Sequence, residues 1–155
     1  MQKNKHIFVF GIFAVDISFY VDKKVKPGET IIAKSSNIGP GGKASNQAIS
    51  ANKLGAATTL ITRLGDDNFN NYANDVWRSE KLFASTKIDK NLPTGMAGIF
   101  IDDKTGENSV IVDPGASAHL SIDDFYSQKS KMKKGDIFLT QFEQSSDTCL
   151  LYTSD

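Results

Sequence analysis

Hydrophobic and β-branched positions along the chain predict short strands separated by helical segments. An apolar run over residues 6–10 ends at a glycine and is typical of a buried parallel strand. A β-branched run over residues 57–64 predicts a second core strand, and residues 137–142 predict another. Apolar residues at helical spacing over residues 69–77 predict an amphipathic helix. This order indicates an α/β fold with a mostly parallel sheet.

Further strand patterns lie outside this alternation. Residues 17–25 alternate loosely, and residues 30–38 form a weaker pattern after the Pro27-Gly28 turn. Residues 94–101 and 108–112 flank a segment rich in turn residues and predict a hairpin. Because a plain βαβ unit has no such strands, we expect a separate β excursion.

A glycine-rich segment, residues 38–48, leads into the first helix. Three glycines within residues 39–42 allow the backbone to approach a ligand closely. Alanines at i, i+4 and i+7 of the following helix form a narrow stripe, so this helix can lie close to a sheet. Its polar first turn, with Lys43 and Asn46, then faces a cavity with free N–H groups. The pattern suits an oxygen-rich ligand.

The same segment can be compared with other glycine-rich motifs. A phosphate-binding P-loop fails because Asn37 replaces its first glycine and Ala44 its hydroxyl residue. A dinucleotide fingerprint fits loosely over residues 39–44, with Asp66 about twenty residues farther on. However, residues 34–37 are too polar for the buried strand that must precede that fingerprint. A helix entry that uses glycine only to turn remains a further alternative.

Composition narrows the classes of function. The chain has 155 residues, of which 39% are hydrophobic and 23% charged, as is ordinary for one globular domain. Its formal net charge is zero, so we expect neither a nucleic-acid partner nor a membrane partner. Residues 1–6 lead into a strand rather than a signal peptide, and we expect a cytoplasmic protein. A single cysteine, Cys149, excludes a disulfide framework.

Short motifs follow one another in order along nearly the whole chain. The main motif is Gly41-Gly-Lys-Ala-Ser-Asn-Gln-Ala48, and Asn52-Lys-Leu-Gly-Ala56 follows it. The others are Pro27-Gly-Glu-Thr30, Leu64-Gly-Asp-Asp67, Thr94-Gly95, Gly106-Glu-Asn108, Pro114-Gly-Ala116 and Gln141-Phe-Glu143. Together they resemble the N-terminal half of the ribokinase (PfkB) family of carbohydrate kinases.

The resemblance implies a ribokinase-like fold, with a truncated Rossmann-like core flanked by helices and a small β-sheet lid over the sugar. The lid strands are expected at about residues 15–38 and 94–113. Residues 1–147 are expected to be the N-terminal part of one such domain, because members of the family are much longer than this chain. Residues 148–155 match nothing expected there, and we interpret them as a non-native tail.

The resemblance also implies a sugar pocket. Asp16 suits hydrogen bonds from neighbouring sugar hydroxyl groups, whereas Lys43 and Asn46 suit sugar oxygens. Glu143 matches a further carboxylate of the pocket. The other positions that match its substrate-contacting part are Ala14, Gly42, Ala44 and Ser45.

One position departs from the family pattern. Ribokinases usually carry Asn two residues before the aspartate, where this chain has Ala14. A missing hydrogen-bond donor changes which hydroxyl group is recognised, so the resemblance leaves the identity of the sugar open. Lys43 favours the ribokinase branch over the fructokinase-like branches, which tend to lack it.

The chemistry that the resemblance implies is transfer of the γ-phosphoryl group of ATP to a sugar hydroxymethyl group, with Mg²⁺ and often a monovalent cation. The catalytic base and nucleotide pocket belong to C-terminal motifs of the family that do not occur here. We therefore expect no catalytic or metal-binding residue in this chain, and no activity from it alone. A homodimer through the β lid is also implied. The alternatives are a dinucleotide-binding oxidoreductase domain and a non-catalytic sugar-binding module.

Overall fold

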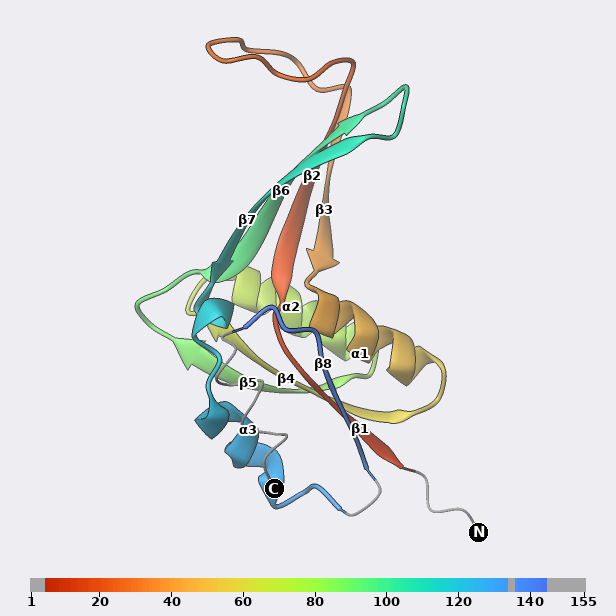
Figure 1. Cartoon of the computed structure of the whole chain (residues 1–155), viewed down its shortest axis with the longest axis vertical. Coiled ribbons are helices and arrows are strands. Elements are labelled where there is room, and N and C mark those ends of the chain that lie inside the picture. The colour runs from red at the N-terminus through yellow and green to blue at the C-terminus, as the bar shows by residue number, and fades with distance from the viewer. Residues whose placement is uncertain (1–4, 134–135, 145–155) are drawn as a thin grey trace.

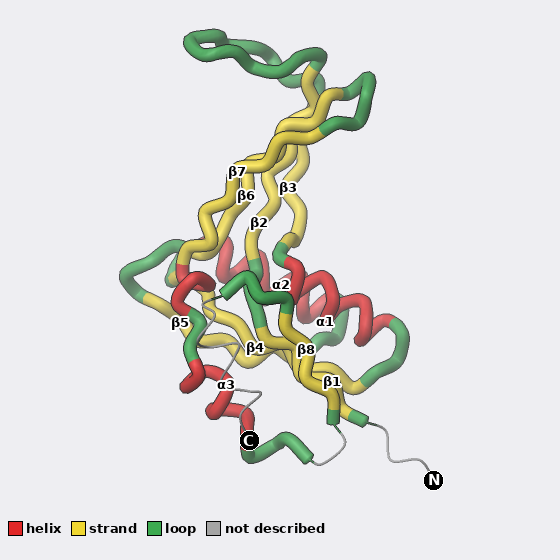
Figure 2. Tube along the Cα trace, in the orientation of Figure 1, coloured by secondary structure: helices red, strands yellow, loops and turns green. Residues whose placement is uncertain are grey.

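The computed structural model describes residues 5–133 and 136–144, which form a core with a long projecting sheet (Figures 1 and 2). The expected tail at 148–155 lies outside these residues. The proposed domain boundary at residue 147 stays a prediction for the same reason. No helix in the described part of the chain is long and apolar enough to cross a membrane.

The core is a four-stranded parallel sheet. Its order is β5 (Phe83–Asp89), β4 (Ala57–Gly65), β1 (His6–Phe10) and β8 (Ile137–Thr140). The predicted core strands are confirmed, whereas β5 carried no clear pattern because it is an edge strand of mixed exposure.

Side chains alternate between the two faces of this sheet. Val9 and Leu60 pack against α1 (Lys43–Lys53) and α2 (Asn68–Ser79). Phe8, Phe10 and Ile61 face the other way and pack with Phe125 of α3 (Ile122–Lys129). The helices therefore cover both faces, as Figure 2 shows.

The first helix lies close to the sheet as its alanine stripe predicts. Ala44 and Ala48 are fully buried, whereas Lys43, Asn46 and Gln47 on the other side of the helix are exposed. Gly55 follows the helix with a φ of 88°, a conformation that favours glycine and ends the helix there.

The other strands form a second four-stranded sheet, which we call the lid. Its order is β3 (Ser35–Gly41), β2 (Ala14–Val21), β6 (Thr94–Asp102) and β7 (Asn108–Gly115). The central pair β2 and β6 is parallel, and each edge strand is antiparallel to its neighbour. The predicted hairpin is β6 and β7. A short 3₁₀ helix, Ala116–His119, returns the chain from the lid to the core.

Two details of the lid differ from the sequence predictions. The strand expected over residues 30–38 begins at Ser35 and continues through Gly41, because its backbone pairs with residues 14–20 of β2. Asp16 precedes the strand expected over residues 17–25, but it lies inside β2, which begins at Ala14, and therefore belongs to the lid. Among the glycines of this segment, Gly42 alone has a positive φ, of 83°.

Candidate functional site

The predicted site residues gather where the lid meets the first turn of α1. Asp16 on β2 pairs in register with Gly39 of β3 and Ala97 of β6. Its carboxylate lies against Gly41, where a Cβ atom would be 2.1 Å from Asp16 Oδ1. Glycine is therefore needed at this position to leave room for the carboxylate.

The Asp16 carboxylate is half-buried. Within the described residues it has no hydrogen-bond or ion-pair partner. Burial raises the pKa of Asp16 above its ordinary value, because removal from water disfavours the charged form. The pKa of Tyr72 is also raised, first by burial and then by the negative charge of Asp16. An ionised carboxylate in this setting is stabilised by a ligand that donates hydrogen bonds.

The N-terminus of α1 supplies donors beside this carboxylate. Gly42 is the N-cap residue, and no side chain caps the helix. The amides of the first turn thus lack an intrahelical acceptor, and that turn contains no acidic residue to compensate for the positive end of the helix dipole. A Cβ atom at Gly42 would lie 2.5 Å from the Ile12 carbonyl oxygen, so the backbone here is closely packed.

Glu143 approaches the same turn from the segment that follows β8. Its Oε1 atom forms an ion pair with Lys43 Nζ, although 100 residues separate the two in sequence. Its other oxygen, Oε2, is buried and has no hydrogen-bond partner among the described residues. Lys43 and Glu143, which the sequence placed in one pocket, are therefore in direct contact.

The other predicted residues near this junction differ in exposure. The Ser45 hydroxyl is fully buried and accepts a hydrogen bond of 3.0 Å from Trp77 Nε1. Ala14 and Ala44 are also buried, whereas Asn46 is exposed on α1. Substrate contacts of Ala14, Ala44 and Ser45 would therefore have to come from main-chain atoms, and they stay predictions.

Sequence reasoning did not single out a glutamine pair beside the site. Gln141 Nε2 donates to Gln47 Oε1 at 2.7 Å, and Gln141 Oε1 is buried without a partner among the described residues. Gln47 and Gln141 each belong to a motif used for the resemblance. Their pairing was not visible because it joins segments 94 residues apart.

The described side chains near this junction are hydrogen-bonding groups and do not form a metal-binding cluster. In the described ranges, no three His, Cys, Asp or Glu side chains gather closely enough to hold a metal ion. The glycine segment also lacks the hydroxyl side chain of a P-loop, because its helix continues with Ala44.

The dinucleotide alternative is wrong. Its fingerprint requires a buried parallel strand directly before the glycines. Here the preceding strand is β3, an antiparallel and largely exposed strand of the lid.

Comparison with known proteins agrees with this geometry. The chain is 34% identical over 151 residues to the ribokinase of Dictyostelium discoideum, covering 97% of this chain and 46% of that protein. It is 32% identical over 145 residues to the deoxyribokinase of Salmonella typhi, covering 92% and 46%. The chain thus spans about half the length of these relatives.

Solved structures of ribokinases also match this chain over about half of their own length. The ribokinase of Giardia lamblia superposes with a TM-score of 0.87 at 28% identity, covering 96% of this chain and 48% of that one. The ribokinase of Arabidopsis thaliana, complexed with ribose and ATP, gives a TM-score of 0.71 at 26% identity, covering 93% and 47%. The model of the pfkB family carbohydrate kinases matches residues 4–146. The chain belongs to the pfkB family of carbohydrate kinases.

Proposed function

We propose that this chain is the sugar-binding portion of an ATP-dependent carbohydrate kinase that phosphorylates a sugar hydroxymethyl group. The observation that carries the proposal is the unpaired, half-buried carboxylate of Asp16 beside the uncapped first turn of α1. A carboxylate accepts hydrogen bonds from two neighbouring hydroxyl groups at once, and charge-assisted bonds are the stronger kind. The amides at Gly42 and Lys43 and the Lys43 ammonium group donate to sugar oxygens.

In this proposal Glu143 acts in two ways. Its paired oxygen holds Lys43 in position, and its free, buried Oε2 accepts a hydrogen bond from a sugar hydroxyl group. Asn46, exposed one turn into α1, supplies a further amide group at the edge of the pocket.

The similarity to ribokinases and to a deoxyribokinase supports a pentose or deoxypentose as substrate. Ala14, in place of the usual Asn, lacks a side-chain donor for one sugar hydroxyl group. A substrate without that hydroxyl group would leave no polar group unpaired, so both sugars belong in the substrate test.

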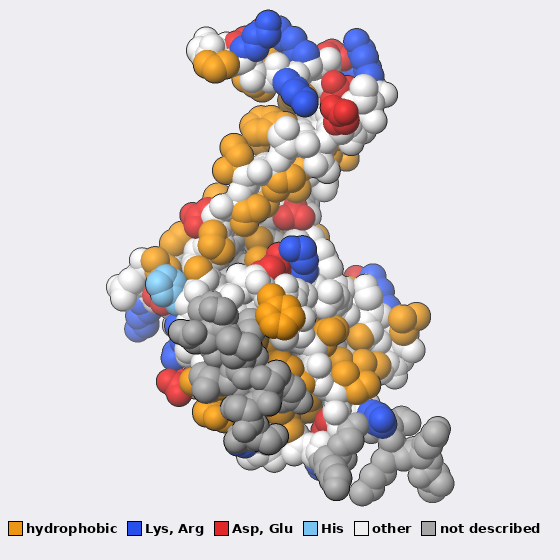
Figure 3. Space-filling view, viewed as in Figure 1, with side chains coloured by type: hydrophobic (Ala, Val, Ile, Leu, Met, Phe, Trp, Pro, Cys, Tyr) orange, Lys and Arg blue, Asp and Glu red, His pale blue; other side chains and the backbone are white. Residues whose placement is uncertain are grey.

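The nucleotide, Mg²⁺ and a monovalent cation would be held by residues of a longer protein, since the site described here does not fit them. We further propose that the lid carries a homodimer contact in a cytoplasmic enzyme. Ile38, Val110, Ile111 and Val112 are exposed on it, and Figure 3 shows hydrophobic side chains along the lid.

Replacement of the central carboxylate tests the proposed function. In a kinase of full family length that contains this chain, Asp16→Asn should lower kcat/KM for the sugar by at least about tenfold, because asparagine has one acceptor oxygen and an unwanted donor. The KM for ATP should not change. Ribose and deoxyribose are compared in a coupled assay of ADP release.

The matched control is Asp22→Asn. Asp22 is the exposed residue that follows β2 and pairs with Lys34 at 2.9 Å, and its replacement should leave the kinetics unchanged. Unaltered sugar kinetics in the Asp16→Asn enzyme would place the sugar elsewhere in the molecule.

A further inference from the structure

Trp77, the single tryptophan of the chain, contacts the first turn of α1 from within the core. It is 1% exposed near the end of α2, and its Nε1 atom donates a hydrogen bond of 3.0 Å to Ser45 Oγ. Ser45 is the third residue of α1 and is fully buried. Trp77 belongs to the hydrophobic cluster between the core sheet and these two helices, so the bond is a polar contact within an apolar core. It ties α2 to the turn that carries Lys43.

The same tryptophan also contacts the link between β1 and β2. The ring centroids of Trp77 and Phe13 are 5.1 Å apart and the ring planes are inclined at 74°, an edge-to-face arrangement. Phe13 directly precedes Ala14, the first residue of β2, and lies three residues before Asp16. Trp77 therefore touches both parts of the candidate site, the segment that leads to Asp16 and the first turn of α1.

These two parts meet backbone to backbone at Gly42. A Cβ atom there would lie 2.5 Å from the Ile12 carbonyl oxygen and 2.7 Å from Phe13 Cα. No side chain separates the helix start from the link, so a small movement of the helix changes the distance from its first amides to the Asp16 carboxylate. The position of the turn therefore has to be fixed by other contacts.

The alanine stripe of α1 fixes only part of that position. Ala44 and Ala48 are fully buried and set how close the helix lies to the sheet. Such small side chains project little between their neighbours, so they resist rotation or sliding of the helix weakly. A hydrogen bond is directional and weakens steeply when its geometry is lost. The bond from Trp77 to Ser45 therefore supplies the restraint that the alanines lack.

We propose that Trp77 is a positioning residue of the sugar site, which holds the first turn of α1 at the distance from Asp16 that the sugar requires. It acts through the Ser45 hydroxyl group and through Phe13, and its own side chain is too deeply buried to touch the sugar. This role rests on the proposed function, because it requires that the amides of this turn and the Asp16 carboxylate bind the same sugar molecule.

Trp77→Phe tests the role, since it keeps an aromatic ring beside Phe13 but removes the N–H donor. In a kinase of full family length that contains this chain, the KM for the sugar should rise by at least about fivefold, because misplaced donors bind the sugar less well. The kcat of the folded enzyme and the KM for ATP should change by less than about twofold. Ribose and deoxyribose are compared by ADP release. A purely structural role would lower the melting temperature without raising the KM for the sugar.

Ser45→Ala removes the acceptor of the same bond and leaves the main chain of the turn in place. Its KM for the sugar should rise as much as that of Trp77→Phe. Because both substitutions break one bond, the double variant should show about the same fivefold rise and not the product of two effects, roughly twenty-five-fold. A multiplied effect would mean that the two residues act separately, and it would overturn the positioning role.

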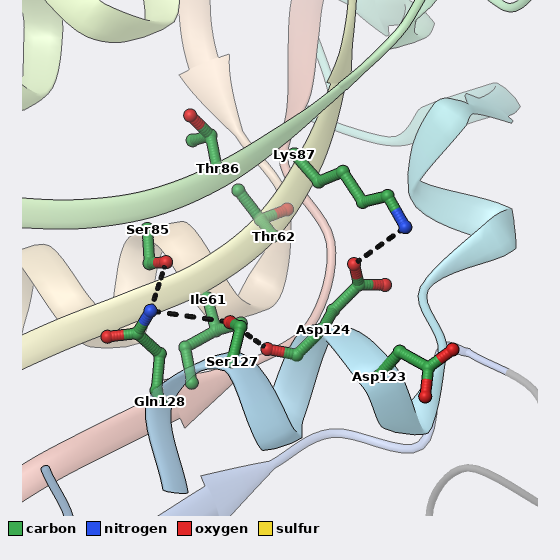
Figure 4. A pocket seen from close by; sticks show the side chains of 9 residues that line it. All are labelled: Ile61, Thr62, Ser85, Thr86, Lys87, Asp123, Asp124, Ser127 and Gln128. Carbon is green, nitrogen blue, oxygen red and sulfur yellow. Dashed lines mark hydrogen bonds and ion pairs between the residues drawn. The ribbon is translucent and has the colours of Figure 1, made fainter. Parts of the chain in front are cut away.

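A matched control lies where α3 packs on the core sheet. There Gln128 Nε2 donates to Ser85 Oγ of β5 at 2.8 Å, a bond that also joins a helix to the core (Figure 4). Ser85→Ala removes this acceptor as Ser45→Ala does at the site, so it should lower the melting temperature but leave the KM for the sugar unchanged. An equal rise in KM in both variants would reduce the effect to a loss of stability and would refute the proposal.

Asp16→Asn distinguishes failure of this role from failure of the proposed function. If Asp16→Asn impairs sugar kinetics whereas Trp77→Phe and Ser45→Ala do not, the sugar site stands and the positioning role is wrong. If none of the three substitutions alters sugar kinetics, the sugar binds elsewhere and both proposals fail.

Discussion

At the scale of single residues, the candidate site depends on the space that a glycine leaves for a neighbouring side chain. The sequence singled out Asp16, Lys43 and Glu143 as candidates, because each carries a functional group at a position that the family resemblance assigns to the sugar pocket. It did not explain Gly41, whose role depends on contact with a carboxylate on another strand. The space that the Asp16 carboxylate requires thus explains the glycine at position 41 better than the general flexibility of glycine does.

Gly41→Ala should therefore impair function more than stability. The added Cβ atom would meet Asp16 Oδ1 at 2.1 Å, and a carboxylate at the end of a side chain can move aside. The free energy of unfolding should fall by less than the roughly 1–3 kcal/mol typical of overpacking a rigid core. In a full-length enzyme the KM for the sugar should rise by at least about tenfold, since the displaced carboxylate loses its hydrogen bonds.

Gly39→Ala on the same strand is the control. Its nearest neighbour would be Asn37 Nδ2 at 3.5 Å, an ordinary contact, and its φ is not positive. Urea denaturation and steady-state kinetics measure both variants. Equal kinetic effects of the two substitutions would contradict the role assigned to Gly41.

At the scale of elements, patterns that are local in sequence were predictable and those set by pairing were not. Asp67 caps the N-terminus of α2, and Ser121 and Asp124 form a capping box at the start of α3, as is typical of these residue types at helix starts. The predicted start of β3 was wrong. This polar, glycine-rich strand is defined by its pairing with β2 and not by alternating apolar residues, so the sequence pattern could not show where it begins.

Asp67 also joins two elements that the sequence did not connect. Its carboxylate accepts from the Thr94 amide at 2.7 Å and the Thr94 hydroxyl at 2.8 Å, at the start of lid strand β6. Burial alone would raise the pKa of Asp67, but the hydrogen bonds from Thr94 and the first turn of α2 outweigh it and lower the pKa. A carboxyl group with a lowered folded-state pKa stabilises the fold above its unfolded pKa and loses that effect as the pH falls.

Asp67→Asn should consequently lower the free energy of unfolding at pH 7 by about 1–3 kcal/mol. The difference from the unchanged chain should shrink as the pH falls below the ordinary aspartate value of 3.8. Urea denaturation at pH 7 and at pH 3 measures it, with the exposed neighbour in Asp66→Asn as control. A difference that stays constant with pH would mean that the charge of Asp67 does not contribute.

At the scale of the whole molecule, the order of strands in the core sheet decides which distant segments meet at the candidate site. The sequence predicted a parallel core and a β lid from motif order, and the two sheets confirm that architecture. The contact between Lys43 and Glu143 depends on β8 lying beside β1, which places the segment after β8 next to α1. Local patterns could not show this arrangement, because it arises from the order of strands in the sheet.

The 155-residue chain alone should therefore not transfer a phosphoryl group. Such transfer depends on holding the nucleotide, its metal ion and the sugar hydroxyl group in line. The described residues gather groups for a sugar but no three potential metal ligands. ATP turnover with a panel of pentoses and hexoses should match a no-sugar control, and Asp16→Asn should behave identically. Sugar-dependent ADP release that disappears in Asp16→Asn would show that the catalytic groups lie within this chain after all.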